Sequence, residues 1–112
     1  MKYLMLVCAG EPVELSTDEQ ARVPSIESWV GEMDGRGVRL LGNQLQAVSD
    51  ATTVRVRHGE VLVADGPFAE TKEQIGGFDI LECSNLDEAI EVASKHPMAH
   101  WGLLELRPFK RP

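Results

Sequence analysis

The sequence has little positive charge and no long apolar run, and both shortages exclude classes of protein. Its 11 Lys and Arg residues stand against 18 Asp and Glu residues, which gives a formal net charge of −7. Nucleic-acid binding needs basic side chains that neutralise phosphates, so DNA and RNA are not expected partners. The apolar segment 1–9 is too short to cross a membrane and lacks a cleavage pattern of small residues. We therefore expect a cytoplasmic protein without a membrane partner.

Cysteine is also scarce, and the familiar cofactor motifs are missing. Cys8 and Cys83 lie far apart without a CxxC spacing, so we expect two buried thiols rather than a disulfide or redox pair. There is no GxGxxG, no GxxxxGK[ST], no GxSxG and no zinc-ligand spacing. His96 and His100 have the spacing of a helical metal pair, but Pro97 between them ends the helix. We expect no cofactor and no metal.

What is present suits one globular domain over residues 1–112. Of the residues, 43% are hydrophobic and 26% are charged, with no linker and no repeat. Apolar patterning and turn residues predict strands over 2–8, 38–44, 53–57, 60–64, 78–83 and 101–107, with the hairpin turn at His58-Gly59. In the hairpin, Val54 and Val56 are expected to face inward.

Two helical stretches separate these strands. A capping box of Ser16 and Glu19 begins the first, and Pro24 is expected in the first turn of its main part. There Ile26, Trp29, Val30 and Met33 recur at helical spacing and should face the sheet before Gly35 and Gly37 end the helix. The second follows a cap at Ser84 or Asn85, presents Leu86, Ala89, Ile90 and Ala93 on one face, and stops at Pro97.

This order predicts a ferredoxin-like α+β fold: a split β-α-β arrangement with an inserted hairpin, in which two helices cover one face of an antiparallel sheet. The first, second and last strands carry apolar residues on both faces, for example Leu4 and Leu6 opposite Tyr3, Met5 and Val7. Two helices cover only one face. We therefore expect a homodimer that packs the helix-free sheet faces together.

The segment from Asp65 to Gly77 interrupts the strand pattern with charges, three glycines and a proline. Asp65-Gly66-Pro67 predicts a rigid turn, and Phe68 is expected to be a buried anchor. The run DGPFAETKEQIGGF, residues 65–78, resembles the signature of the DGPFAETKE (DGPF domain) family, a branch of the YCII-related proteins. With residues 51–55 and 102–108, the resemblance covers nearly the whole chain.

The resemblance implies a dimeric α/β-barrel type with a pocket between sheet and loops. A histidine and aspartate pair proposed in one YCII branch has no counterpart here, because the first helix lacks histidine and His96 stands before Pro97. One YCII-type class is assigned to dehydrochlorination of a hydroxyquinol, which by analogy implies lyase chemistry. DGPF-type proteins are also associated with extracytoplasmic sigma factors, which implies a sensing role.

Candidate catalytic residues are Asp65, His96 and His100, and candidate ligand-binding residues are Phe68, Glu70, Lys72 and Glu73. Each has a plainer interpretation. Asp65 could cap its own turn, and the charge run could be a solvated surface. His58, at the hairpin tip, is expected to be exposed.

Two hypotheses for function follow from these residues. In the first, the protein binds a small molecule beside the 65–77 segment, with acid/base chemistry of a lyase or isomerase type. In the second, it is a ligand-binding or regulatory module without turnover. The first requires Asp65 and a histidine to line one pocket, which distinguishes the two hypotheses.

Overall fold

The computed structural model describes residues 1–68 and 74–111. Its strands are β1 (Lys2–Ala9), β2 (Arg39–Gln44), β3 (Thr52–Arg57), β4 (Glu60–Asp65), β5 (Gln74–Glu82) and β6 (Leu103–Pro108). Its helices are α1 (Thr17–Arg22), α2 (Ile26–Gly35), α3 (Leu86–Ser94) and α4 (Met98–Trp101), with a 3-10 turn η1 (Val48–Asp50). In the described part of the chain, no helix is long and apolar enough to span a membrane.

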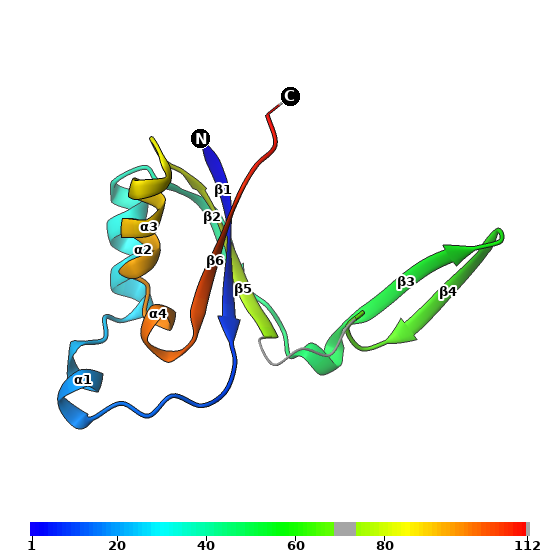
Figure 1. The fold of residues 1–112 in the computed structure, drawn as a ribbon, viewed down its shortest axis with the longest axis horizontal. Coiled ribbons are helices and arrows are strands. Elements are labelled where there is room, and N and C mark those ends of the chain that lie inside the picture. The colour runs from blue at the N-terminus through cyan, green and yellow to red at the C-terminus, as the bar shows by residue number, and fades with distance from the viewer. Residues whose placement is uncertain (69–73, 112) are drawn as a thin grey trace.

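The main sheet has the strand order β2-β5-β1-β6, and every neighbouring pair is antiparallel. Helices α2 and α3 lie together on one side of it (Figure 1). The protein is therefore of the mixed α+β class with antiparallel sheets. The predicted strands all form, with ends that differ by a few residues; β5 begins four residues before the predicted start at residue 78.

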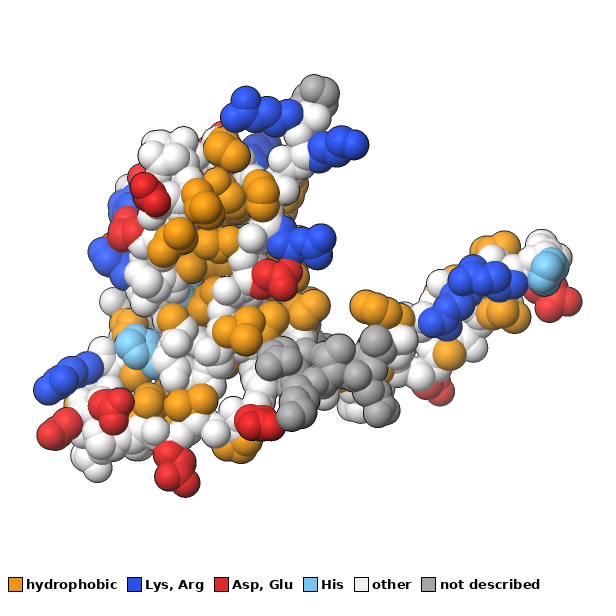
Figure 2. All heavy atoms as spheres, viewed as in Figure 1, with side chains coloured by type: hydrophobic (Ala, Val, Ile, Leu, Met, Phe, Trp, Pro, Cys, Tyr) orange, Lys and Arg blue, Asp and Glu red, His pale blue; other side chains and the backbone are white. Residues whose placement is uncertain are grey.

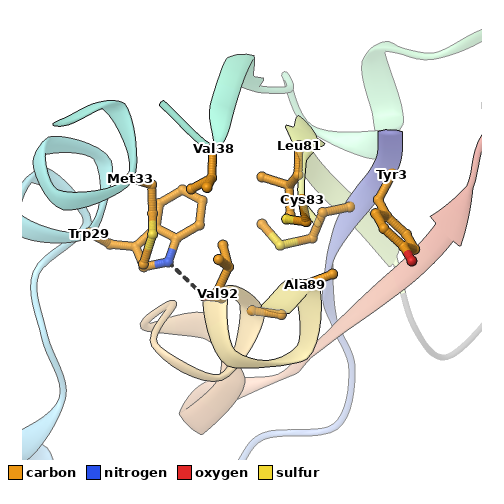
Figure 3. Packing of buried hydrophobic residues seen from close by; sticks show 10 residues of the cluster. Tyr3, Trp29, Met33, Val38, Leu81, Cys83, Ala89 and Val92 are labelled. Atoms are coloured by element: carbon orange, nitrogen blue, oxygen red, sulfur yellow. Dashed lines mark hydrogen bonds between the residues drawn. The ribbon is translucent and has the colours of Figure 1, made fainter. Parts of the chain in front are cut away.

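The core lies between the main sheet and these two helices. Tyr3, Met5 and Leu81 from the sheet pack against Trp29 and Met33 of α2 and against the buried side of α3 (Figure 3). The indole Nε1 of Trp29 donates a hydrogen bond of 2.9 Å to the carbonyl oxygen of Val92 in α3. This bond joins the two helices where neither group could reach water.

The helix starts follow local capping chemistry. The capping box of Ser16 and Glu19 is confirmed, since the Ser16 hydroxyl accepts from the Glu19 amide and the Glu19 carboxylate accepts from the Ser16 amide. Asn85 caps α3 as one of the two predicted residues. The place of Pro24 was predicted wrongly: the Ser25 hydroxyl caps α2, so the proline lies before the helix.

The apolar faces of the helices differ in detail from the prediction. In α2, Trp29 and Met33 are buried, whereas Ile26 is 42% exposed. In α3 the buried residues are Ala89, Val92 and Ala93, while Leu86 and Ile90 remain about half exposed. The helix therefore turns its smaller side chains to the sheet, which allows a close approach. Cys8 and Cys83 are both buried, as predicted.

The opposite face of the main sheet carries apolar side chains that none of the helices in the described residues covers. Leu4 pairs with Ile80 and Leu6 with Phe78 across β1 and β5. All four are only partly buried, in contrast to Tyr3, Met5 and Leu81 on the helix side. Because side chains alternate along a strand, these four residues form one apolar surface, here called the helix-free face.

Strands β3 and β4 form a separate two-stranded hairpin. Its turn has positive φ angles at His58 (51°) and Gly59 (79°), as a primed turn requires. The hairpin extends away from the main sheet on the side opposite α2 and α3 (Figure 1). The expectation that Val54 and Val56 face inward is wrong: they share one face of the hairpin, but they are 60% and 57% exposed.

Candidate functional site

A cavity of about 450 Å³ lies between α2, the start of α4 and the adjoining ends of β1, β2 and β5. This volume is in the range of small-molecule sites. Most of its wall is apolar, with a few polar groups. Its lining residues are Val7, Ala9, Ile26, Val30, Arg39, Asn43, Gln44, Gly76, Gly77, Phe78, Asp79, His96, Pro97 and Met98.

Asp79 is the acidic residue of this cavity, and strand alternation places it there. Along β5, Gly77, Asp79 and Leu81 are buried on the helix side, and Asp79 pairs with Met5 of β1. The Asp79 carboxylate therefore lies on the same side of the sheet as the core residues. Gly42, its neighbour in β2, leaves the room it needs, because a Cβ at position 42 would collide with the Asp79 carboxylate.

Arg39 holds this carboxylate from the neighbouring strand. Its Nε donates to Asp79 Oδ1 at 2.8 Å, Nη1 donates to Asp34 Oδ1 at 3.2 Å, and Nη2 donates to the Gly42 carbonyl at 3.2 Å. A guanidinium has five N–H groups, so two remain for a ligand. The second Asp79 oxygen accepts no hydrogen bond from the described residues. No fully buried polar side-chain atom among them lacks a partner, so this oxygen reaches accessible space.

Burial and charge act in opposite directions on the ion pair. Burial raises the pKa of Asp79, and the hydrogen bond and charge of Arg39 only partly offset that effect. Burial also opposes the charge of Arg39, but its bonds to Asp79 and Asp34 outweigh this, and the pKa of Arg39 rises. A carboxylate with increased proton affinity beside a permanent cation is an arrangement typical of proton-transfer sites.

His96 contributes an imidazole in a fixed orientation. It is 3% exposed, and its ring meets Trp29 edge-on, with centroids 4.7 Å apart. Its Nδ1 accepts a hydrogen bond of 3.0 Å from the Met98 amide, which assigns the proton of the neutral ring to Nε2. Burial lowers the pKa of His96 to about 4. Near neutral pH the ring therefore presents an uncharged Nε2–H donor.

Together these groups supply both donors and an acceptor within an apolar wall. The Asp79 carboxylate can accept a proton, while Arg39 and the His96 Nε2–H can donate hydrogen bonds to a ligand oxygen. Such a set suits a compact, mostly apolar molecule with a hydroxyl or carbonyl group. Among the described residues, no group of three or more His, Cys, Asp or Glu side chains is placed to hold a metal ion.

The structure brings one predicted catalytic residue, His96, to the cavity. Asp65 is exposed at the end of β4, and His100 is exposed in α4; neither lines the cavity. The Asp65 side chain makes no hydrogen bond with the described residues. The predicted pairing of Asp65 with a histidine in one pocket is absent from the cavity described here.

The 65–77 segment reaches the cavity at its far end. Gly76 and Gly77 line the wall, and Gly66 has the positive φ (93°) that glycine accommodates. The expected burial of Phe68 is wrong, because its side chain is 81% exposed. Three of the predicted ligand-binding residues lie outside the described residues: Glu70, Lys72 and Glu73.

Sequence reasoning missed Asp79 and Arg39 as site residues. The signal for Asp79 was present, since it shares a strand face with Leu81 and an acidic residue on a core-facing position needs a partner. Arg39 opens β2 beside the apolar Leu40 and Leu41 and looks like an ordinary strand-end charge. Only the pairing of β2 with β5 shows that the two side chains meet.

Comparison with known proteins places the chain in a family. The model of the YCII-related domain matches residues 1–111. The protein belongs to the YCII-related family. An uncharacterised protein of Rhizobium meliloti is 45% identical over 67 residues, which are 58% of this chain and 54% of that protein. The chain thus spans about half the length of this curated relative.

A solved structure also resembles this YCII-related protein. It is the 5-chloro-2-hydroxyhydroquinone dehydrochlorinase from Burkholderia phenoliruptrix in complex with 2,5-dihydroxybenzoquinone. The TM-score is 0.47 and the identity 14%, over 100% of this chain and 96% of that one. A likeness this distant carries no argument about the fold or reaction of the present protein.

Proposed function

We propose that this YCII-related protein binds a small molecule in the cavity between α2, α4 and the sheet, and that Asp79 exchanges a proton with it. The observation that carries the proposal is the buried Asp79–Arg39 ion pair, which lines the same apolar cavity as His96. A structural ion pair needs no cavity beside it. A binding site does need a few convergent polar groups in an apolar enclosure.

The ligand class follows from the lining. Arg39 is bonded to two carboxylates, Asp79 and Asp34, so a free carboxylate or phosphate would gain only part of the attraction of Arg39. A hydroxyl or carbonyl group can donate to Asp79 or accept from Arg39 and His96, while an apolar body fills the space beside Val7, Val30 and Met98. Proton removal by Asp79 is the first step of an isomerase or a lyase, and Arg39 would stabilise the negative charge that develops.

We further infer a ferredoxin-like fold of the dimeric α/β-barrel type and membership of the DGPFAETKE branch. The strand order β2-β5-β1-β6, with α2 and α3 on one side, supports the first inference, and the run DGPFAETKE from Asp65 supports the second. The helix-free face supports a homodimer, since no described helix or strand layer covers its four apolar side chains. Asp65 and His100 have no role in the proposed site.

A thermal-shift screen tests the binding proposal. The library contains compact aromatic and alicyclic hydroxyl and carbonyl compounds. A ligand that binds only the folded state at about 100 times its Kd stabilises it by about 2.7 kcal/mol. Hits should stabilise the native protein and the control Asp50→Asn, whose exposed carboxylate lies in η1, but stabilise Asp79→Asn and His96→Asn much less. Equal stabilisation of all four proteins would contradict the proposed site.

Deuterium incorporation tests the proton transfer separately. A bound hit with an exchangeable C–H is incubated with the protein in D₂O and followed by NMR. The native protein should accelerate exchange, and Asp79→Asn should lose the acceleration while it keeps its fold. Binding without any exchange would favour the ligand-binding module without turnover.

A further inference from the structure

The β3–β4 hairpin carries four valines on one face, and the pair Thr52 and Asp65 continues that face at the end furthest from the turn. Cross-strand pairing places Val54 opposite Val63 and Val56 opposite Val61, and directly opposed residues point to the same side of a two-stranded sheet. All four side chains are between 57% and 66% exposed. The other face is mixed, with Arg57 opposite Glu60 and Arg55 opposite Leu62. The hairpin is therefore amphipathic, and none of the described residues covers its apolar side.

This valine face, defined as Val54, Val56, Val61 and Val63, lies on an element with little support of its own. Within the described residues, β3 and β4 make extensive contacts only with each other. An isolated two-stranded hairpin is marginally stable at best in water, and a second layer on its apolar face is the usual remedy. Figure 2 shows hydrophobic side chains along the hairpin, on either side of basic side chains that face the viewer.

Charge decides which kind of partner fits. The hairpin holds Arg55 and Arg57 against Glu60 and Asp65, so it carries no formal net charge, while the chain as a whole has a charge of −7. An anionic membrane would find no electrostatic attraction to the uncharged hairpin and would be repelled by the negative charge of the remainder of the protein. A strongly charged protein partner would likewise find no complementary field on this face. The surface suits a second uncharged apolar surface.

The chain itself offers an apolar surface on the same side, bordered on β6 by Glu105 and Arg107, whose opposite charges leave it without a net charge. The hairpin extends from the side of the main sheet that bears the helix-free face (Figure 1). A second copy that covers the helix-free face is therefore placed to reach the valine face as well. In a two-fold dimer each copy both gives and receives the contact, so a single interface covers both apolar surfaces.

We infer that the hairpin is a dimerisation arm whose valine face packs onto a second copy of this chain. The inference rests on the homodimer proposed above. It extends the interface beyond the sheet to an arm with its own apolar side chains.

The test compares a change on the valine face with a matched change on the opposite face. Val56→Thr/Val61→Thr keeps β-branched side chains of similar shape and removes apolar surface. Leu62→Thr removes apolar surface from the other side. Dimer dissociation constants are measured by analytical ultracentrifugation. The valine variant should weaken the dimer by about ten-fold or more, because each change acts twice in a two-fold interface, whereas Leu62→Thr should change the constant by less than about three-fold.

Several outcomes overturn the inference. If the valine variant dimerises like the native protein while Leu6→Asn on the helix-free face weakens the dimer, the sheet interface stands and the arm has no part in it. A native protein that is monomeric at about 100 μM overturns both the arm and the dimer, but leaves the cavity proposal untouched. Co-sedimentation with phosphatidylcholine/phosphatidylglycerol vesicles that depends on the valines would make a membrane the occupant instead.

Hydrogen exchange in the native protein covers the case in which the valine variant loses its hairpin. Backbone amides of residues 52–65 should exchange more slowly above the dimer dissociation constant than below it, since the arm is covered only in the dimer. Protection that does not depend on protein concentration would refute the arm.

Discussion

Replacing His96 by Asn should remove a defined part of the pH dependence of stability. The histidine pKa is lowered from 6.5 to about 4 by burial, so below pH 6.5 the unfolded chain binds a proton at this site that the folded chain does not. Stability is therefore unaffected by His96 above pH 6.5 and falls as the pH drops toward 4. From these two pKa values, the loss between about pH 7.5 and pH 5 is about 2 kcal/mol.

The replacement is chosen to isolate this effect. Asn places an oxygen near the position of the imidazole Nδ1, so the Met98 amide keeps an acceptor. Its smaller side chain leaves a gap beside Trp29, which lowers stability by a constant amount at every pH. The measured quantity is consequently the slope of stability against pH, and the absolute stability does not enter.

The assay is urea unfolding between pH 5 and 7.5, with His100→Asn as the control. His100 is an exposed histidine in α4, and its replacement controls for the loss of one imidazole from the chain. Arg36 lowers the pKa of Glu91 to about 2, so the contribution of this ion pair to folding stability is lost only below pH 4.5. It does not affect the slope between pH 5 and 7.5. The raised pKa of Asp79 favours the folded state as the pH falls, but it is common to all three proteins and cancels in the comparison. An unchanged slope in His96→Asn would refute the buried neutral imidazole.

Three further changes test other contacts. Trp29→Phe removes the donor to the Val92 carbonyl and should lower the free energy of unfolding by about 1–3 kcal/mol, measured by urea denaturation. Phe68→Ala should alter stability by less than about 0.5 kcal/mol in the same assay, because the ring is 81% exposed; a large loss would show that the ring is buried. Gly42→Ala should displace the Asp79 carboxylate and weaken ligand binding in calorimetry; unchanged affinity would show that Asp79 does not depend on this space.

The local features of the fold were predictable because they depend on neighbours in the sequence. A capping box needs only Ser16 and Glu19, and a primed turn needs only His58-Gly59. The same holds for strand patterning, which located the strands of the main sheet. Strand alternation shows which side chains share a face, but it does not show whether that face meets the core or solvent. The valines of the hairpin do share a face, but they are exposed and not in the core as predicted.

The site was less predictable because it depends on pairing between distant strands. Asp79 and Arg39 lie 40 residues apart and meet only through the register of β2 and β5. His96 was chosen for its chemistry, and in the structure it lines the cavity. Asp65 and Phe68 attracted attention because a turn-rich segment often carries function, whereas among the described residues of that segment Gly76 and Gly77 line the wall.

NMR mapping of a bound hit tests the central claim most directly. A compound found by thermal shift is titrated into ¹⁵N-labelled protein, and backbone amide shifts are followed. Binding in the cavity predicts that the largest changes fall on residues of its wall, such as Asn43, Gly77, Asp79 and Met98, and that Asp79→Asn reduces the affinity. Largest changes on the β3–β4 hairpin or on the outer side of α3, with an affinity unaffected by Asp79→Asn, would contradict the claim.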